Sequence, residues 1–334
     1  MKRILGVAIA ASLILAASAA EAACTYFAAL DQDVTQPGQR AFITWDPVEK
    51  IESFTVQPQF QGNARDFGMV IPTPSRPKLK EAPREIFKDL ALFTVLEPRP
   101  CTKRYAKSSM AESGGGRAVP TASPPKVTVL EAGVVGTLDY KIIRAEDAAD
   151  LFTWLKDNGY SYAGDEATLN FYVSRKWLFT VMKIDPSAMK KGADGSYTGD
   201  VSPTRFQFAS KELIYPLRIT QLSVKDTTNA LLYVMTKDKI QLPGSKLEYA
   251  KRLTAADLKK VGAGPVAIPQ PSMNLEPPQR HDFKDLKGWM TEGYFLTKVR
   301  RVFRKEEMTD DLRLVSAGDS VEYTSYEDCG GMPP

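Results

Sequence analysis

Short apolar runs recur along the chain, and most of them end at proline or at a polar turn, which is the pattern of β-strands. In residues 54–60, apolar and polar side chains alternate. A second apolar run covers 67–71, and polar residues including Arg65 and Asp66 lie between the two runs. We therefore predict a hairpin with this polar pair at its tip. Pro58 has no N–H to donate, so it predicts that the first strand lies at a sheet edge or a bulge.

The same criteria predict more strands than helices. Strands are expected at 41–45, 126–130, 138–143, 177–184, 205–208, 215–224, 231–235, 294–303 and 312–315. Apolar residues at helical spacing predict helices near 83–93, 147–158 and 166–174, with shorter ones near 257–261 and 282–290. Because hairpin-like neighbours outnumber β-α-β alternation, we predict an α+β fold, mostly antiparallel β-sheet with three or four helices. An echo between FGMVIPTP at 67–74 and LIYPLRIT at 213–220 raises the option of two related β-rich halves.

The start of the chain has the organisation of a secretory signal. Two basic residues and an apolar stretch over 4–19 precede Ala-Glu-Ala at 20–22, which offers small residues at the positions that a signal peptidase reads. We expect cleavage after Ala22 and a periplasmic or secreted mature protein. Residues 23–334 are expected to form one unit, in which the Ser-, Gly- and Pro-rich stretch 107–125 is a mobile loop. No later apolar run approaches the ~20 residues of a membrane helix.

Three cysteines, Cys24, Cys101 and Cys329, would enter an oxidising space together. One pair is expected to form a disulfide and one thiol to remain. We favour Cys101–Cys329, while the two other pairings stay open. Cys24 also leaves lipoprotein anchoring as an alternative, although Glu21 stands where a lipobox has a Leu-like residue.

The chain has one histidine, His281, which is too few for the usual histidine-based zinc site. We expect it to be a solvated residue at the start of a helix. A Cys101–His281 dyad conflicts with the favoured disulfide. Adjacent carboxylates such as Asp310 and Asp311 diverge on a helix or strand, so adjacency does not make a catalytic pair, and we expect these two to flank a turn. The sequence therefore singles out no catalytic, cofactor-binding or metal-binding residue.

The densest basic segment contains the candidate anion-binding residues Arg300, Arg301, Arg304 and Lys305. In a strand, Arg300 and Arg304 would share one face, opposite Arg301 and Lys305. Such a segment suits an anionic glycan or lipid headgroup, whereas the alternative is a solvated sheet edge that resists aggregation. The formal net charge of +4 is spread thinly, so nucleic acid is not expected as a partner.

Several short stretches resemble the bacterial family called domain of unknown function 2330. They are FQG at 60–62, FGMVIPTP at 67–74, Pro100-Cys101, LEAG at 130–133, YPLR at 215–218, LTKVR at 296–300 and MTDDL at 308–312. The resemblance covers nearly the whole mature chain and implies one exported family unit. It supplies no activity. At Cys24 the chain departs from the Cys-Gly-Gly-Phe-like start of the family, because it continues Thr25-Tyr26-Phe27.

These observations favour a non-catalytic exported protein that binds or scaffolds a component of the cell envelope, with no cofactor. Its partner is unknown, and a glycan is one option. The alternative is a periplasmic or extracellular hydrolase whose carboxylates come together only in the folded chain.

Overall fold

The computed structural model describes residues 26–27, 34–35, 38–57, 59–62, 67–100, 127–136, 138–158, 166–184, 190–191, 197–200, 203–269 and 278–328. Several predicted features lie outside these residues. They are the signal at 1–22, the loop at 107–125, the hairpin tip at Arg65 and Asp66, and the three cysteines.

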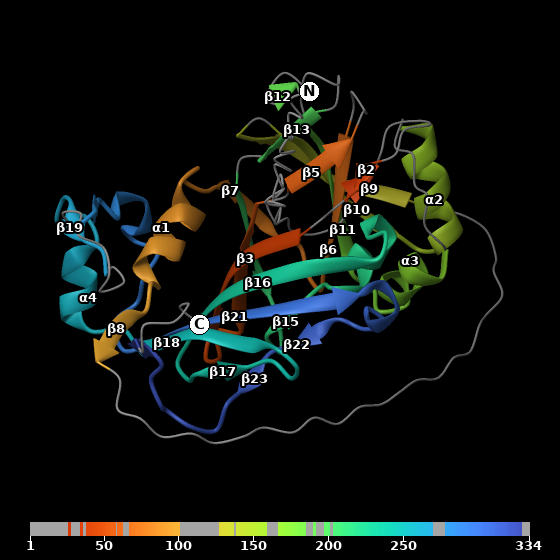
Figure 1. Ribbon diagram of the computed structural model, residues 1–334. Coiled ribbons are helices and arrows are strands. Elements are labelled where there is room, and N and C mark those ends of the chain that lie inside the picture. The colour runs from red at the N-terminus through yellow and green to blue at the C-terminus, as the bar shows by residue number, and fades with distance from the viewer. Residues whose placement is uncertain are drawn as a thin grey trace, which may run out of the picture.

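Two sheets form the centre of the molecule (Figure 1). The five-stranded sheet is antiparallel throughout, in the order β1 (Tyr26–Phe27), β6 (Phe67–Thr73), β11 (Leu178–Ile184), β10 (Leu138–Ala145) and β9 (Val127–Val135). The seven-stranded sheet has the order β18 (Lys246–Arg252), β21 (Phe295–Arg304), β16 (Thr227–Thr236), β3 (Gly38–Asp46), β4 (Ile51–Val56), β14 (Thr204–Ala209) and β7 (Lys78–Glu81). Only the β16–β3 pair of this sheet is parallel.

The remaining described strands are short. A four-stranded sheet contains β12 (Lys190–Lys191), β13 (Tyr197–Asp200), β5 (Gln59–Gly62) and β2 (Val34–Thr35). Four further pairs are β15 (Ile214–Tyr215) with β22 (Leu312–Arg313), β17 (Ile240–Gln241) with β23 (Val315–Ser316), β19 (Val266–Ala267) with β20 (Arg280–His281), and β24 (Ser325–Asp328) with β8 (Glu97–Pro100).

Helices cover the outer faces of both sheets. The α-helices are α1 (Ile86–Phe93), α2 (Ala148–Asp157), α3 (Glu166–Val173) and α4 (Ala255–Lys260), and the 3-10 helices are η2 (Arg218–Ser223), η3 (Lys284–Leu286) and η4 (Lys305–Glu307). Helices α2 and α3 pack on the five-stranded sheet, while α1, η3 and α4 pack on the seven-stranded sheet. The arrangement is therefore helix, sheet, sheet, helix, with the helical layers at opposite ends in Figure 1.

Side-chain alternation along the inner strands builds this order of layers, because successive residues of a strand point to opposite faces. In β6, Met69 and Ile71 join the cluster between the two sheets, whereas Val70 packs toward α2 and α3. In β3, Ile43 faces the other sheet and Phe42 faces α1. At these positions β6 and β3 are therefore buried on both sides.

The α+β class and the antiparallel sheets are confirmed, but the predicted hairpin is wrong. β4 pairs with β3 and β14, and β6 pairs with β1 and β11 in the other sheet. β4 is an inner strand, whereas Pro58, from which a sheet edge or a bulge was predicted, lies outside the described residues. The sequence shows only that both runs are apolar. It does not show that β5 leads the chain into a separate sheet between them.

The strand predicted at 215–224 is also wrong, because β15 has two residues and is followed by η2. Side chains supply the backbone partners here: Asp311 Oδ1 accepts from the N–H of Arg218 at 3.1 Å, and Tyr172 Oη accepts from the N–H of Ile219 at 3.0 Å. β6 is by contrast an inner strand of seven residues. The echo between these two stretches does not extend to the structure.

Asp311 was expected at a turn, yet its side chain is buried. Tyr172 donates its hydroxyl proton to Asp311 Oδ1 at 2.6 Å, so one carboxylate oxygen joins helix α3 to the start of η2. Burial raises the pKa of Asp311 to about 6, against the opposing effect of its hydrogen bonds with Tyr172 and Arg218. Asp310 does flank the turn, since its Oδ1 accepts from the N–H of Asp311.

Asp311→Asn should flatten part of the pH dependence of stability. A carboxyl whose pKa is higher in the folded than in the unfolded chain contributes stability below pH ~4, and this contribution is lost as the pH rises through about 6. An asparagine oxygen can accept the same two hydrogen bonds without ionising. As the pH rises from 4 to 7, we expect the free energy of unfolding of wild type to fall by about 2–3 kcal/mol more than that of the variant. Urea unfolding of both proteins across this range measures the difference, and parallel curves would contradict it.

Candidate functional site

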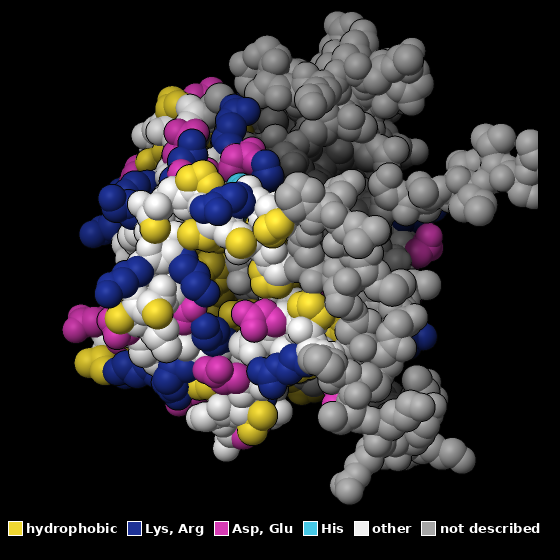
Figure 2. Space-filling model, turned by 60° about the vertical axis from the view of Figure 1, so that its left-hand side comes forward, with side chains coloured by type: hydrophobic (Ala, Val, Ile, Leu, Met, Phe, Trp, Pro, Cys, Tyr) yellow, Lys and Arg dark blue, Asp and Glu magenta, His cyan; other side chains and the backbone are white. Residues whose placement is uncertain are grey.

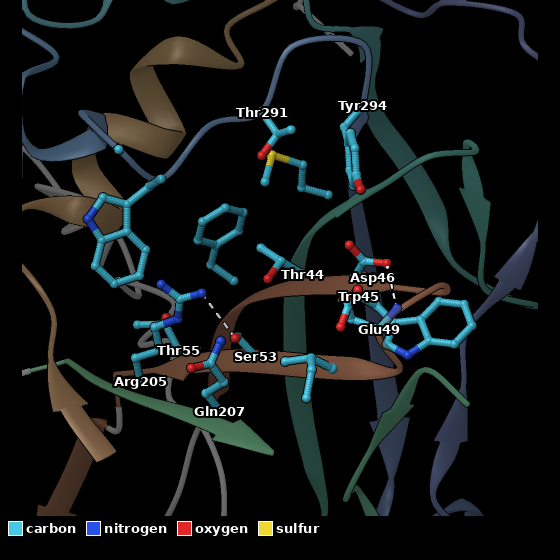
Figure 3. Close-up of a pocket in the computed structure, with 15 residues that line it drawn as sticks. Thr44, Trp45, Asp46, Glu49, Ser53, Thr55, Arg205, Gln207, Thr291 and Tyr294 are labelled. Atoms are coloured by element: carbon cyan, nitrogen blue, oxygen red, sulfur yellow. Dashed lines mark hydrogen bonds between the residues drawn. The ribbon is translucent and has the colours of Figure 1, made fainter. Parts of the chain in front are cut away.

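A pocket of about 370 Å³ lies on the outer face of the seven-stranded sheet (Figure 3). Its lining residues are Phe42, Thr44, Trp45, Asp46, Glu49, Ile51, Ser53, Thr55, Arg205, Gln207, Met235, Gly288, Trp289, Thr291 and Tyr294. The face belongs to the same side of the sheet as the cluster with α1, which includes Phe42 and Met235. The pocket is therefore the polar continuation of that helix-covered face.

The floor of the pocket is fixed by strand register. In one row across β14, β4 and β3, Arg205 lies opposite Thr55 and Thr55 opposite Phe42. In the next row, Gln207 lies opposite Ser53 and Ser53 opposite Thr44. Residues that are partners across a sheet point to the same face, so these polar side chains converge without any motif that is local in sequence.

The alternate residues of the same strands explain why the floor can be polar. Phe54 and Phe206 point the other way and stack in the cluster between the sheets, with ring centroids 5.1 Å apart. These strands therefore gain their apolar burial on the inner face. The outer face is left available for hydroxyl and amide groups.

Two segments provide the walls. Trp289, Thr291 and Tyr294 come from the segment between η3 and β21, and Trp45 comes from the end of β3. The rings of Trp289 and Phe42 lie 6.4 Å apart between centroids. In Figure 3, Trp45 lies on the side of the pocket away from Arg205. The pocket thus combines aromatic walls with a hydrogen-bonding floor.

The two ends of the pocket carry opposite charge. Arg205 is half-buried, and its Nη2 donates to Ser53 Oγ at 3.0 Å. Its guanidinium carbon lies 5.0 Å from the centroid of the Trp289 ring, and burial lowers the pKa of Arg205. Asp46 and Glu49 lie at the other end (Figure 3).

Asp46 is built to stay ionised. The backbone N–H groups of Glu49 and Val48 donate to its Oδ1 at 3.1 Å and 2.8 Å and lower the pKa of this carboxyl. A general acid of a glycosidase needs the opposite, a carboxyl that keeps its proton near neutral pH. Asp46 is therefore not suited to be the general acid, whereas an electrostatic role, or that of a nucleophile or base, is compatible with an ionised carboxylate.

The single histidine, His281, contacts the helix that holds the segment leading into the pocket wall. The expectation that it is solvated is wrong. His281 has a side chain only 20% exposed, and its Nε2 lies 2.6 Å from Asp89 Oδ1 on α1. The other oxygen of Asp89 accepts from the backbone N–H of Asp285 at the start of η3. Burial raises the pKa of Asp89, while the hydrogen bond with His281 opposes the rise. Asp89 thus ties α1 to the segment that leads into the pocket wall.

The predicted anion-binding residues lie apart from the pocket, and none of them lines it. Arg300 Nε lies 2.6 Å from Glu248 Oε1, and Arg301 and Arg304 both lie within 4 Å of Glu307. Lys305 begins η4 and is not part of the strand. β21 lies between β18 and β16 only as far as Arg300, and from Arg301 to Arg304 it pairs with β16 alone, so the alternative of a sheet edge stays open for this end of the strand. Anion binding by these residues stays a prediction.

Charged side chains are mixed on the described part of the face shown in Figure 2, where basic groups are interspersed with acidic and apolar ones.

Within the described ranges, no three His, Cys, Asp or Glu side chains gather as metal ligands would. None of the helices in the described part of the chain is long and apolar enough to cross a membrane.

The sequence matches the model of a bacterial family, described as uncharacterized protein conserved in bacteria (DUF2330), over residues 18–315. The chain belongs to this family. No curated protein matches the sequence. Among solved structures, the crystal structure of baculovirus P35 aligns with 86% of this chain and 98% of that chain at 9% identity, with a TM-score of 0.29. A score of this size does not establish a shared fold.

Asp89→Ala should destabilise the protein, because it leaves His281 and the N–H of Asp285 without their shared acceptor. We expect a loss of about 2–4 kcal/mol in the free energy of unfolding, measured by urea denaturation. Lys88→Ala is the matched control on an exposed position of the same helix and should change stability by less than about 0.5 kcal/mol. Equal effects of the two substitutions would contradict an anchoring role for Asp89.

Proposed function

We propose that this protein is a non-catalytic binding protein of the bacterial cell envelope, which holds a small polar ligand in the pocket on the seven-stranded sheet. The observation that carries the proposal is the convergence of Thr44, Ser53, Thr55 and Gln207 on a floor between aromatic walls. A cavity of about 370 Å³ has the size of small-molecule sites, and its many polar lining residues suit a polar ligand. The family assignment adds that the protein is bacterial in type.

A hydrolase that uses facing carboxylates is the alternative. The carboxylates that line the pocket are Asp46 and Glu49, which lie together at one end (Figure 3). The lowered pKa of Asp46 does not suit a general acid, and the two carboxylates do not face each other across the pocket. Binding is therefore the function that the geometry supports best.

The envelope compartment rests on the signal at the start of the sequence, and the Cys101–Cys329 disulfide is proposed as a consequence of it. Strands β24 and β8 form a parallel ladder in which Asp328 is the partner of Pro100, and in the sequence Cys329 and Cys101 come next. Neighbouring strands lie about 4.8 Å apart, within the range of Cα separations that a disulfide bridges. The ladder thus supports the pairing that the sequence favours.

Filling the pocket should abolish binding. The purified mature protein would be titrated by calorimetry with soluble glycan and peptide fractions released from bacterial envelopes. We expect saturable heat with wild type and none with Gln207→Trp, which places a large ring on the floor. Thr128→Trp, at an exposed position of the other sheet, is the matched control and should bind as wild type does. Binding that survives Gln207→Trp would show that the pocket is not the site.

The mass of the protein exported by a bacterial host tests the compartment and the disulfide together. We expect a chain that begins at Ala23, with one disulfide between the peptides that contain Cys101 and Cys329 and a free, unacylated Cys24. Peptide mapping without reductant identifies the bonded pair. An intact Met1, or three reduced thiols in the exported protein, would rule out the proposed processing.

A further inference from the structure

Arg205 is a half-buried cation of the pocket that has no carboxylate partner among the described residues. Its contacts with described residues are one hydrogen bond to the hydroxyl of Ser53 and the ring of Trp289, and none of the described carboxylates forms an ion pair with it. Taking a guanidinium partly out of water without a counter-charge is unfavourable. Burial lowers the pKa of Arg205 in agreement with that cost.

Some other partly buried cations of the protein are paired with carboxylates, whereas Arg218 and Arg252 have backbone carbonyl and ring partners. The side chain of Arg300 is 29% exposed and lies 2.6 Å from Glu248, and that of Lys251 is 25% exposed and lies 2.6 Å from Asp257. The fold therefore supplies carboxylates to some cations of similar exposure, and Arg205 is not one of them. Arg205 lines the open space of the pocket, where a ligand can reach its guanidinium.

The side chain of Arg205 is also held in place. Ser53 fixes one end of the guanidinium, and the ring of Trp289 lies 5.0 Å from its central carbon. A guanidinium has five N–H donors in a planar fork that matches the two oxygens of a carboxylate. An arginine held by its neighbours loses little entropy on binding such a group.

The opposite end of the pocket limits the charge of the ligand. Asp46 and Glu49 line that end, and Asp46 is kept ionised by the backbone of its own turn. A ligand with negative groups at both ends would be repelled there. Between the ends, Thr44, Ser53 and Gln207 form the row that can hydrogen-bond to hydroxyl groups.

We infer that the ligand is a sugar acid, whose single carboxylate binds Arg205 and whose hydroxyl groups lie on the floor between the aromatic walls. This inference rests on the proposed function and names the ligand class of the same site. Arg205 is the residue that makes the pocket specific for an acid over the corresponding neutral sugar, because an unpaired buried group penalises a ligand that lacks its counterpart.

Calorimetry with matched sugars tests the inference. The probes are galacturonate against galactose and glucuronate against glucose, which differ only at C6, where a carboxylate replaces a hydroxymethyl group. Glucose 6-phosphate serves as a dianionic probe. We expect at least one uronate to bind about 10- to 100-fold more tightly than its neutral partner, and the phosphate to bind more weakly than that uronate. Arg205→Gln should remove this preference. Arg205→Lys should restore part of it, because it keeps the charge but not the planar fork.

A matched control and a stability measurement separate a ligand-binding role from a structural one. Arg144→Gln, at an exposed position of the five-stranded sheet, should bind as wild type does. Without ligand, Arg205→Gln should unfold at the same or a higher temperature than wild type, because it removes an uncompensated charge. The uronate should raise the unfolding temperature of wild type and not that of the variant. A lower unfolding temperature of the free variant, with unchanged binding, would make Arg205 a structural clamp and overturn the inference.

The outcomes also separate this inference from the proposed function. Equal binding of neutral and acidic sugars that is insensitive to Arg205→Gln overturns the sugar-acid inference and leaves the pocket as a binding site. The same holds if glucose 6-phosphate is the tightest ligand, or if no uronate binds while an envelope fraction does so in the pocket. If neither the sugars nor the envelope fractions bind, both proposals fail.

Discussion

The face-to-face packing of two sheets is the constraint on which the rest of this structure depends. Because side chains alternate along a strand, each strand of the inner layers must provide an apolar row for the partner sheet. Met69 and Ile71 do this from one sheet, and Ile43, Phe54 and Phe206 do it from the other. The opposite row of each strand is then free to meet a helix or to remain polar. The layered architecture and the pocket both follow from this division.

The pocket exists because the outer face of the seven-stranded sheet is covered unevenly. Helix α1 and η3 bury Phe42 and Tyr233, whereas Thr44, Ser53 and Gln207 lie beyond this cover. The Trp289 segment then closes one side, and the contacts of Asp89 with His281 and Asp285 hold the layer from which it comes. A polar site is thereby carried on a rigid sheet, which suits binding better than a loop does.

Much of the fold could be predicted from the sequence, because apolar spacing is local. The pattern identified α1, α2 and α3, the long strands β11 and β21, and the antiparallel α+β class. Strand partners could not be predicted. β4 and β6 are equally apolar and near in sequence, yet they belong to different sheets. The 3-10 helix η2 was missed because its N–H groups bond to the side chains of Asp311 and Tyr172, which lie far away in sequence.

The candidate site was missed for a similar reason. Arg205, Ser53 and Trp289 come from distant segments, and only strand register and packing bring them together. A weak signal was present, since Thr44, Ser53, Thr55 and Gln207 are the polar positions of strands whose alternate positions are strongly apolar. The anion site expected at Arg300 and Arg304 followed from charge density, which does not show that Glu248 and Glu307 lie beside those residues.

The parallel contact between β3 and β16 has a consequence for how the chain reaches its native state. Gln39 and Thr228 meet there although 189 positions separate them, and β21 joins the same sheet only near the end of the sequence. Contacts of such high order slow folding, since the entropy of closing a long loop must be overcome before they form. β3 can therefore complete its sheet only after nearly the whole polypeptide has been synthesised. A protein with this topology therefore remains unfolded for longer than one built from local hairpins.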